Sequence, residues 1–319
     1  MKNFSNPNFG MRKRAKKKRR EMDKINKINI YDTLSSMAHA YIPQQYHLPT
    51  YLQQWVPGIT PLSTLEGVAS AIVAYLAIIF GGRELMRGRE PFKLKIAFQL
   101  HNTVLYVGSG VLLALMAEEV VPMIYKHGFY YSICSEEAWT DKLEFYYIIN
   151  YYFKYIELID TVFLVLKKKP LAFLHVFHHA ATAALCYTQL EGRTAVSWVV
   201  ISLNLAVHVL MYYYYYATAG GARIWWKKYL TTMQITQFII DIFIVYFATY
   251  QHYGYRWGWP HVGDCTGSRF AAFCGCGLLT SYLFLFIAFY VKTYKSVGRR
   301  TSVKKAVTEA GTAPVPVSK

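Results

Sequence analysis

Seven long apolar stretches, each about the length of a membrane-spanning helix, dominate this 319-residue sequence. A helix needs roughly 20 mostly apolar residues to cross the hydrocarbon core of a bilayer. By that criterion we predict seven transmembrane helices, at residues 61–82, 98–121, 145–166, 171–190, 195–217, 230–251 and 271–292. The residues are 54% hydrophobic, which also favours an all-α polytopic membrane protein over a soluble domain.

The links between these stretches alternate in their content of lysine and arginine. Links 1, 3 and 5 and the segment after the last stretch are basic, whereas links 2, 4 and 6 contain fewer such residues. Basic links of membrane proteins tend to stay in the cytoplasm. The C-terminus is therefore expected in the cytoplasm, and seven spans then place the N-terminus on the lumenal side.

The run Arg12–Arg20, "RKRAKKKRR", argues against this orientation, because such runs normally stay cytoplasmic. However, no lysine or arginine occurs between Ile28 and Thr60, and the rule counts charges near the spans. We expect residues 1–57 to be a basic, largely disordered tail, 58–295 to be the membrane domain and 296–319 to be a disordered cytoplasmic tail. The net charge of +17 is not accompanied by a nucleic-acid-binding motif, so no nucleic acid is expected as a partner.

Polar side chains inside the predicted spans fall on aligned helical faces. In "KYIELIDT", Lys154, Glu157 and Asp160 follow one another at steps of three, and in "LHVFHHA" three histidines share one face. Ionisable groups at membrane depth are costly and usually functional. An ion-pair cluster that only fixes helix packing is the alternative for the first group. The remaining aligned polar residues are His101, Asn102, Asn204, His208, Gln234, Gln237 and Asp241.

These polar faces should meet inside the bundle, because lipid cannot supply their hydrogen-bond partners. With the orientation given above, the cluster opens toward the cytoplasm and leaves an apolar half beyond it. Such an arrangement suits an amphiphile with a charged head and a long chain. We therefore expect the seven helices to enclose an apolar tunnel.

The clustered histidines also raise the possibility of a metal site. Membrane di-iron desaturases and hydroxylases carry several histidine boxes, whereas the ten histidines here form only one box. Three or four imidazoles without a second cluster would hold at most a single ion such as zinc. We therefore predict no catalytic metal, and a di-iron desaturase or hydroxylase is kept as an alternative.

Four motifs together resemble the ELO family of fatty-acid elongases, in the order and spacing of that family. They are "KYIELIDT", "HVFHH", "NLAVHVLMYYYYY" and "TTMQITQF", and the similarity spans roughly residues 55–295. The resemblance implies a seven-helix enzyme of the endoplasmic reticulum membrane, a 3-oxoacyl-CoA synthase in which the helices enclose an acyl tunnel. Malonyl-CoA and a long-chain acyl-CoA would give a 3-oxoacyl-CoA longer by two carbons, with release of CoA and carbon dioxide.

The resemblance also implies roles for the motif residues. Because no cysteine lies among them, we predict that His178 accepts the acyl chain, as the family implies for the first histidine of the pair. His208 would polarise the thioester or stabilise the enolate, and His175 and His179 would position these groups. Residues that orient the substrates and CoA would be Lys154, Glu157, Asp160, Thr161, Asn204, Met211, Tyr212, Gln234, Gln237 and Asn102.

No cofactor is expected beyond the two CoA substrates. Membrane lipid and the other elongation-cycle enzymes (3-oxoacyl-CoA reductase, dehydratase and enoyl reductase) are the expected partners, and a homodimer is compatible with the sequence. A non-enzymatic seven-helix lipid-binding protein is a second alternative. The preferred chain length is not encoded in any motif that we recognise.

Two of the five cysteines lie in links rather than in spans. Cys134 is in link 2 and Cys265 is in link 6, which the predicted orientation places on the same non-cytoplasmic side. We predict that they form a disulfide in an oxidising lumen.

Overall fold

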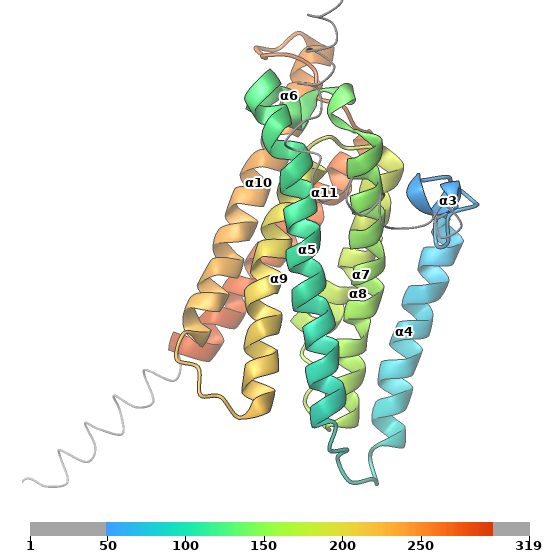
Figure 1. Ribbon diagram of the computed structural model, residues 1–319, viewed down its shortest axis with the longest axis vertical. Coiled ribbons are helices and arrows are strands. Elements are labelled where there is room, and N and C mark those ends of the chain that lie inside the picture. Colours follow the sequence, from blue (N-terminus) through green and yellow to red (C-terminus); the bar gives the residue numbers. More distant parts are fainter. Residues whose placement is uncertain (1–48, 296–319) are drawn as a thin grey trace, which may run out of the picture. The chain divides into compact units, whose positions relative to one another are not determined.

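The structure is a computed structural model that describes residues 49–295, and this part of the chain is helical throughout, without strands (Figure 1). The run Arg12–Arg20 and both predicted tails, apart from residues 49–57, lie outside the described residues.

Each of the seven predicted spans corresponds to one long helix, with ends that differ from the prediction by a few residues. These helices are α4 (Leu65–Leu85), α5 (Lys95–His127), α7 (Asp141–Leu166), α8 (Phe173–Gly192), α9 (Ser197–Gly220), α10 (Lys227–Trp257) and α11 (Arg269–Tyr290). Shorter elements are α3 (Thr50–Gln53), α6 (Phe129–Cys134), η2 (Glu136–Ala138) and the π-helical turn η3 (Val291–Lys295).

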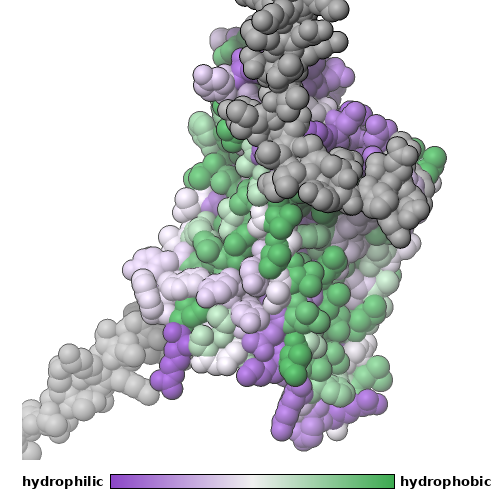
Figure 2. All heavy atoms as spheres, in the orientation of Figure 1, coloured by the Kyte–Doolittle hydropathy of each residue, from purple (hydrophilic) through white to green (hydrophobic). Residues whose placement is uncertain are grey.

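Five of these helices are long and apolar enough to cross a membrane, namely α4, α5, α9, α10 and α11 with its extension to Tyr294. The protein is therefore a multi-pass membrane protein. Helices α7 and α8 do not reach the same hydropathy, because they carry the charged and histidine motifs. Figure 2 shows hydrophobic side chains over the middle of the helices on the face in view, with hydrophilic side chains toward the two ends.

Local capping explains where several of these helices begin. Side-chain oxygens of Thr64, Thr140 and Ser268 accept hydrogen bonds from backbone N–H groups in the first turns of α4, α7 and α11. Such caps satisfy backbone donors that have no partner within the helix. Helices α9 and α10 end at Gly221 and Gly258, whose positive φ values favour glycine.

Six of the long helices form a closed ring. Going around it, α5 contacts α9, α9 contacts α10, α10 contacts α11, α11 contacts α8, α8 contacts α7, and α7 contacts α5 again. Helix α4 packs outside this ring, against α7 and α8. The interior of the ring is therefore enclosed by protein on all sides.

Successive long helices run in opposite directions, so their links gather at two ends of the ring (Figure 1). The α4–α5, α7–α8 and α9–α10 links lie at one end, which we call the basic end because these links carry Arg87, Lys167–Lys169 and Arg223. The α5–α7, α8–α9 and α10–α11 links lie at the other end, which we call the disulfide end.

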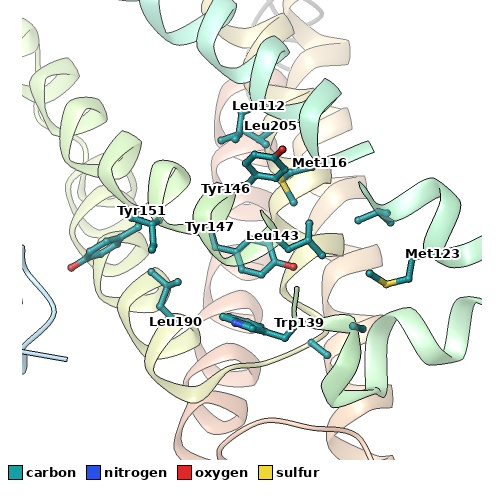
Figure 3. Close-up of a cluster of buried hydrophobic side chains, with 14 of the residues drawn as sticks. Leu112, Met116, Met123, Trp139, Leu143, Tyr146, Tyr147, Tyr151, Leu190 and Leu205 are labelled. Carbon is teal, nitrogen blue, oxygen red and sulfur yellow. The ribbon is translucent and has the colours of Figure 1, made fainter. Parts of the chain in front are cut away.

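Large apolar and aromatic side chains pack α5, α7, α8 and α9 together toward the disulfide end (Figure 3). Met116 of α5, Leu143 and Tyr151 of α7 and Leu205 of α9 are at most 1% exposed. Burial of such side chains contributes roughly 1.5–3 kcal/mol each where the alternative is water. This cluster forms a hydrophobic core toward the disulfide end.

Cys134 of α6 and Cys265 of the α10–α11 link form a disulfide, the pairing expected from the sequence. The Thr266 N–H also donates to the carbonyl of Cys134 at 2.8 Å, which holds the two links together. Among the described cysteines, Cys186, Cys274 and Cys276 are free.

Reduction of this disulfide, or the change Cys134→Ser, is expected to lower the free energy of unfolding by about 2–5 kcal/mol. The bond joins residues 131 apart in sequence, and such a crosslink restricts the unfolded chain strongly. Thermal unfolding in detergent with and without reductant measures the effect, and Cys274→Ser is the control. Intact-mass analysis that finds Cys134 and Cys265 as free thiols in untreated protein would contradict the pairing.

The buried carboxylate of Glu144 holds the segment before α4 against the disulfide end. It accepts hydrogen bonds from the backbone N–H of Trp55 at 2.7 Å and from the indole N–H of Trp139, and Arg193 lies 3.3 Å away. The packed part of the chain therefore includes Trp55, a few residues before the predicted domain boundary at 58.

The change Glu144→Ala is expected to lower the free energy of unfolding by about 2–4 kcal/mol, because hydrogen bonds to a charged group are each worth about 1.5–3 kcal/mol. Glu191→Ala is the matched control, since Glu191 accepts one exposed hydrogen bond from the Trp55 indole. Chemical denaturation in detergent compares the two. Equal losses of unfolding free energy in both variants would show that Glu144 contributes no more to stability than the exposed Glu191.

Candidate active site

Two connected cavities lie inside the ring of helices. The outer cavity, of about 390 Å³, reaches residues of the basic end, including Pro170, Lys227 and Tyr294. The inner cavity, of about 70 Å³, extends toward Trp139 and Val196 at the disulfide end. Four residues line both cavities: His178, Asn204, Gln237 and Phe238.

The three histidines of α8 line the outer cavity, and His178 also faces the inner one. Their spacing places them on one face of the helix, as the sequence predicted. The ring centres of His175 and His179 are 4.4 Å apart, and the ring centres of His178 and His179 are 5.8 Å apart. His178 thus lies where the two cavities adjoin.

Aromatic side chains from α10 and α11 surround His178. Its ring centre lies 4.7 Å from that of Tyr282, 5.7 Å from that of Phe286 and 6.3 Å from that of Phe238. The Nδ1 atom of His178 is buried and has no hydrogen-bond partner among the described residues. The ring is therefore positioned by packing, while at least one of its nitrogen atoms is uncommitted.

Three buried polar residues and the half-buried Asn204, from α7 and α9, form a closed circuit beside these histidines. Lys154 Nζ donates to Glu157 Oε1 at 2.9 Å and to Asn204 Oδ1 at 2.8 Å. The Asn204 amide nitrogen lies 3.2 Å from His208 Nε2. His208 Nδ1 lies 3.2 Å from Glu157 Oε1, within ion-pair range although not aligned as a hydrogen bond.

This circuit determines the protonation of His208. Lys154 can only donate, so the oxygen of the Asn204 amide must face it and the nitrogen must face His208. His208 Nε2 therefore accepts, and the proton of the neutral ring is on Nδ1, beside the Glu157 carboxylate. Nε2 of His208 is thus paired with Asn204, while Nδ1 lies beside the Glu157 carboxylate without an aligned hydrogen bond.

A second buried junction is centred on Asp160 of α7. One carboxylate oxygen is 2.9 Å from His101 Nε2 of α5, and the other accepts a hydrogen bond from the Tyr212 hydroxyl of α9, also at 2.9 Å. Because the carboxylate accepts, His101 donates from Nε2. Asp160 therefore ties three helices together on the wall of the outer cavity.

The glutamines of α10 face the same space. Gln234 lines the outer cavity and its amide lies 3.5 Å from the sulfur of Met211. Gln237 lines both cavities and donates from Nε2 to Asp241 Oδ2 at 3.0 Å. Asp241 is fully buried and orients the amide of Gln237.

Two residues predicted for the site are placed elsewhere. Asn102 lines neither cavity and donates to the carbonyl of Phe98 in its own helix, whereas its neighbour His101 contacts Asp160. Thr161 is bonded to the Tyr75 hydroxyl at 2.9 Å, and it joins α7 to α4 outside the ring.

Sequence reasoning did not assign four contributors to the site. His101 was recognised as polar, but no signal ranked it above Asn102. The aromatic residues Phe238, Tyr282 and Phe286 lie in uniformly apolar stretches, where their sequence neighbours carry no sign of a site. Only the folded arrangement of α8, α10 and α11 brings them to His178.

Within residues 49–295, no group of three or more His, Cys, Asp or Glu side chains is arranged to hold a metal ion. His127 ends α5, His252 lies in the last turns of α10 and His261 lies in the α10–α11 link, all toward the disulfide end. His39 and His47 lie outside the described residues.

The fold and the site together define a multi-pass membrane protein with a histidine site buried inside a ring of helices. Residues 60–302 match the family model described as "ELO: GNS1/SUR4 family". The chain therefore belongs to the ELO family of fatty acid elongases, as its four motifs indicated.

Similar curated proteins agree with this assignment. The chain is 48% identical over 284 residues to "Putative fatty acid elongase 1" of Schizosaccharomyces pombe, which covers 88% of this chain and 83% of that protein. It is 44% identical over 268 residues to "Putative fatty acid elongase 2" of the same organism, and the match covers 83% of this chain and 72% of that protein. It is 36% identical over 255 residues to "Fatty acid elongase A" of Dictyostelium discoideum, and the match covers 79% of this chain and 90% of that protein.

Proposed function

We propose that this protein catalyses the condensing step of fatty-acid elongation. Malonyl-CoA and a long-chain acyl-CoA would react to give a 3-oxoacyl-CoA longer by two carbons, CoA and carbon dioxide. The observation that carries this proposal is the position of His178, which lines both an outer cavity that also contains the other motif histidines and carboxylates and an inner, mainly apolar cavity. A thioester at that position has its CoA arm in the outer cavity and its acyl chain in the inner one.

In this mechanism, an uncommitted nitrogen of His178 attacks the thioester carbonyl of the acyl-CoA. The carbon–sulfur bond breaks, the imidazole carries the acyl group, and the CoA thiolate takes the proton that the imidazolium releases. Loss of carbon dioxide from malonyl-CoA then leaves an enolate, which forms the new carbon–carbon bond to the acyl carbonyl. The carbon–nitrogen bond to His178 breaks, and the departing imidazole takes up one proton from solvent, the proton that the net reaction consumes. Covalent catalysis of this kind replaces one difficult step by two easier ones.

The role proposed for His208 changes in the light of the circuit with Lys154, Glu157 and Asn204. Its Nε2 is paired with Asn204 and its Nδ1 lies beside the Glu157 carboxylate, so we expect no N–H of His208 to be directed at a substrate. We assign His208 to positioning rather than to direct polarisation of the thioester. His175 and His179 retain the supporting role expected from the sequence.

The proposed topology has seven spans, with α7 and α8 crossing the membrane as members of the ring. Both helices lie between apolar neighbours, α5 and α11, so their polar faces turn inward. The basic end would be cytoplasmic by the distribution of lysine and arginine, and the disulfide would lie in the lumen of the endoplasmic reticulum. The outer cavity would then open to cytoplasmic CoA esters.

The remaining partners follow from the reaction. The 3-oxoacyl product requires a 3-oxoacyl-CoA reductase, a dehydratase and an enoyl reductase to complete a cycle, so these enzymes and membrane lipid are the proposed partners. No cofactor or metal has a step in this mechanism. A di-iron desaturase is the competing function, and bound iron in the purified protein would favour it.

Product analysis by mass spectrometry tests the proposed function. Detergent-purified protein receives malonyl-CoA and a panel of acyl-CoAs from C16 to C24, with His178→Ala as the control. We expect a 3-oxoacyl-CoA two carbons longer than the substrate, absent from the control. If well-folded protein gives no product with any chain, condensation is the wrong reaction, and iron content and desaturation are measured next.

A further inference from the structure

Two residues that line the inner cavity each have one buried polar atom without a hydrogen-bond partner within residues 49–295. One such atom is Nδ1 of His178, which the proposed mechanism uses, and the other is Oδ1 of Asn150. Asn150 is only 2% exposed. The other polar groups farther down this cavity are paired, since Thr182 contacts the Tyr282 hydroxyl and Gln189 donates to the carbonyl of Ala271.

An amide that faces an apolar cavity without a partner is unfavourable. A buried acceptor left unsatisfied costs roughly 1–3 kcal/mol, and such groups are rare in native proteins. A leucine at this position would fill the same space without that cost. Asn150 therefore marks a place where the occupant of the cavity is expected to carry a polar group.

The depth of Asn150 can be measured along α8. Its amide nitrogen lies 3.8 Å from the sulfur of Cys186, which also lines the inner cavity. Cys186 follows His178 by eight residues, so at 1.5 Å per residue it lies roughly 12 Å farther from the basic end. The polar position is thus well below the reacting groups.

A hydroxyl group matches the chemistry of this position. It donates to the amide oxygen in the observed orientation, and it accepts from the amide nitrogen if the amide is turned by 180°. A carbonyl group could only accept, so it would satisfy one of these orientations. A water molecule offers the same O–H chemistry and is the other possible source.

We propose that Asn150 binds a hydroxyl group on the acyl chain, so that the enzyme accepts hydroxylated acyl-CoAs with the hydroxyl at a defined depth. This inference rests on the proposed function, because it takes the inner cavity as the acyl site. An extended polypeptide advances roughly 3.6 Å per residue over three backbone bonds, or about 1.2 Å per bond. We apply the same advance per bond to an extended acyl chain. A carbon roughly ten bonds beyond the acylated His178 would therefore lie level with Asn150.

The first test scans the position of the hydroxyl with the wild-type protein. A series of octadecanoyl-CoAs, each with a single hydroxyl at a different carbon, is elongated with malonyl-CoA and compared with the unsubstituted chain. We expect the ratio of kcat/KM for the hydroxylated chain to kcat/KM for the unsubstituted chain to peak when the hydroxyl is near the ninth to twelfth carbon. A ratio that shows no peak along the chain would overturn the proposal and assign the site to water.

The second test removes the amide. Asn150→Leu is expected to lower the ratio at the peak by roughly three- to tenfold, the value of one net hydrogen bond. Ile201→Leu, a volume-conserving change in the same cavity, is expected to leave the ratio as it is. A peak that persists in Asn150→Leu would overturn the proposal.

Binding is measured separately so that the two proposals can fail independently. Displacement of a radiolabelled octadecanoyl-CoA from His178→Ala by each member of the series involves no acyl transfer, and it should show the same peak. Failure to elongate the unsubstituted chain would refute the condensation reaction, whereas a displacement series without a peak would refute only the hydroxyl site.

Discussion

The change His178→Ala is expected to abolish elongation and to remove the covalent acyl adduct. Incubation of the wild-type protein with acyl-CoA alone should add one acyl mass and release CoA, because His178 has an uncommitted nitrogen at the junction of the two cavities. Loss of a catalytic nucleophile lowers turnover by about a thousandfold or more in comparable enzymes. Intact-mass spectrometry and product analysis measure the two effects on the same preparation.

His179→Ala is the matched control for this prediction, since His179 is adjacent in sequence and faces only the outer cavity. It should slow turnover while the adduct still forms. An adduct that is lost in His179→Ala and kept in His178→Ala would show that the neighbouring imidazole is the nucleophile. An active enzyme that forms no adduct with either residue intact would indicate a single-step reaction of both substrates.

The change Glu157→Ala is expected to lower the free energy of unfolding by about 3–5 kcal/mol, the usual effect of removing one partner from a buried ion pair. Glu157 and Lys154 are each 3% exposed, and the change leaves the ammonium of Lys154 with only the oxygen of Asn204. Activity should fall as well, because the Nδ1 proton of His208 loses its acceptor. Denaturant titration in detergent measures the stability.

Glu84→Ala provides a surface control, because Glu84 pairs with Arg87 at 2.8 Å on exposed side chains. An exposed pair contributes about 0–1 kcal/mol, so this variant should be close to wild type. The double change Lys154→Met with Glu157→Leu should recover stability but not activity. Similar stability losses for Glu157→Ala and Glu84→Ala would refute the buried circuit.

The helices and their polar faces could be predicted because both depend on short-range periodicity. Apolar runs of membrane length predicted seven helices, and steps of three and four residues placed His175, His178 and His179 on one face. The pairing of Cys134 with Cys265 followed from the alternation of the links. These features need no knowledge of which helix lies beside which.

The rest of the site depends on contacts between distant helices, which no local pattern encodes. The position of α4 outside the ring is one example, since its hydropathy resembles that of α5. The choice between His101 and Asn102 depends on the rotation of α5 against α7. The protonation of His208 depends on three partners from two helices, and the ring of aromatic residues at His178 depends on the packing of α10 and α11.

The partners of the polar residues in α7 have a consequence for biogenesis. Lys154 is neutralised by Glu157 within the same helix, Asp160 pairs with His101 of α5, and Thr161 pairs with Tyr75 of α4. Each of these partners is synthesised before α7 is complete. The nascent α7 can therefore leave the translocon with its charges matched, before α8 and α9 have been translated, and the later helices assemble the active site around it.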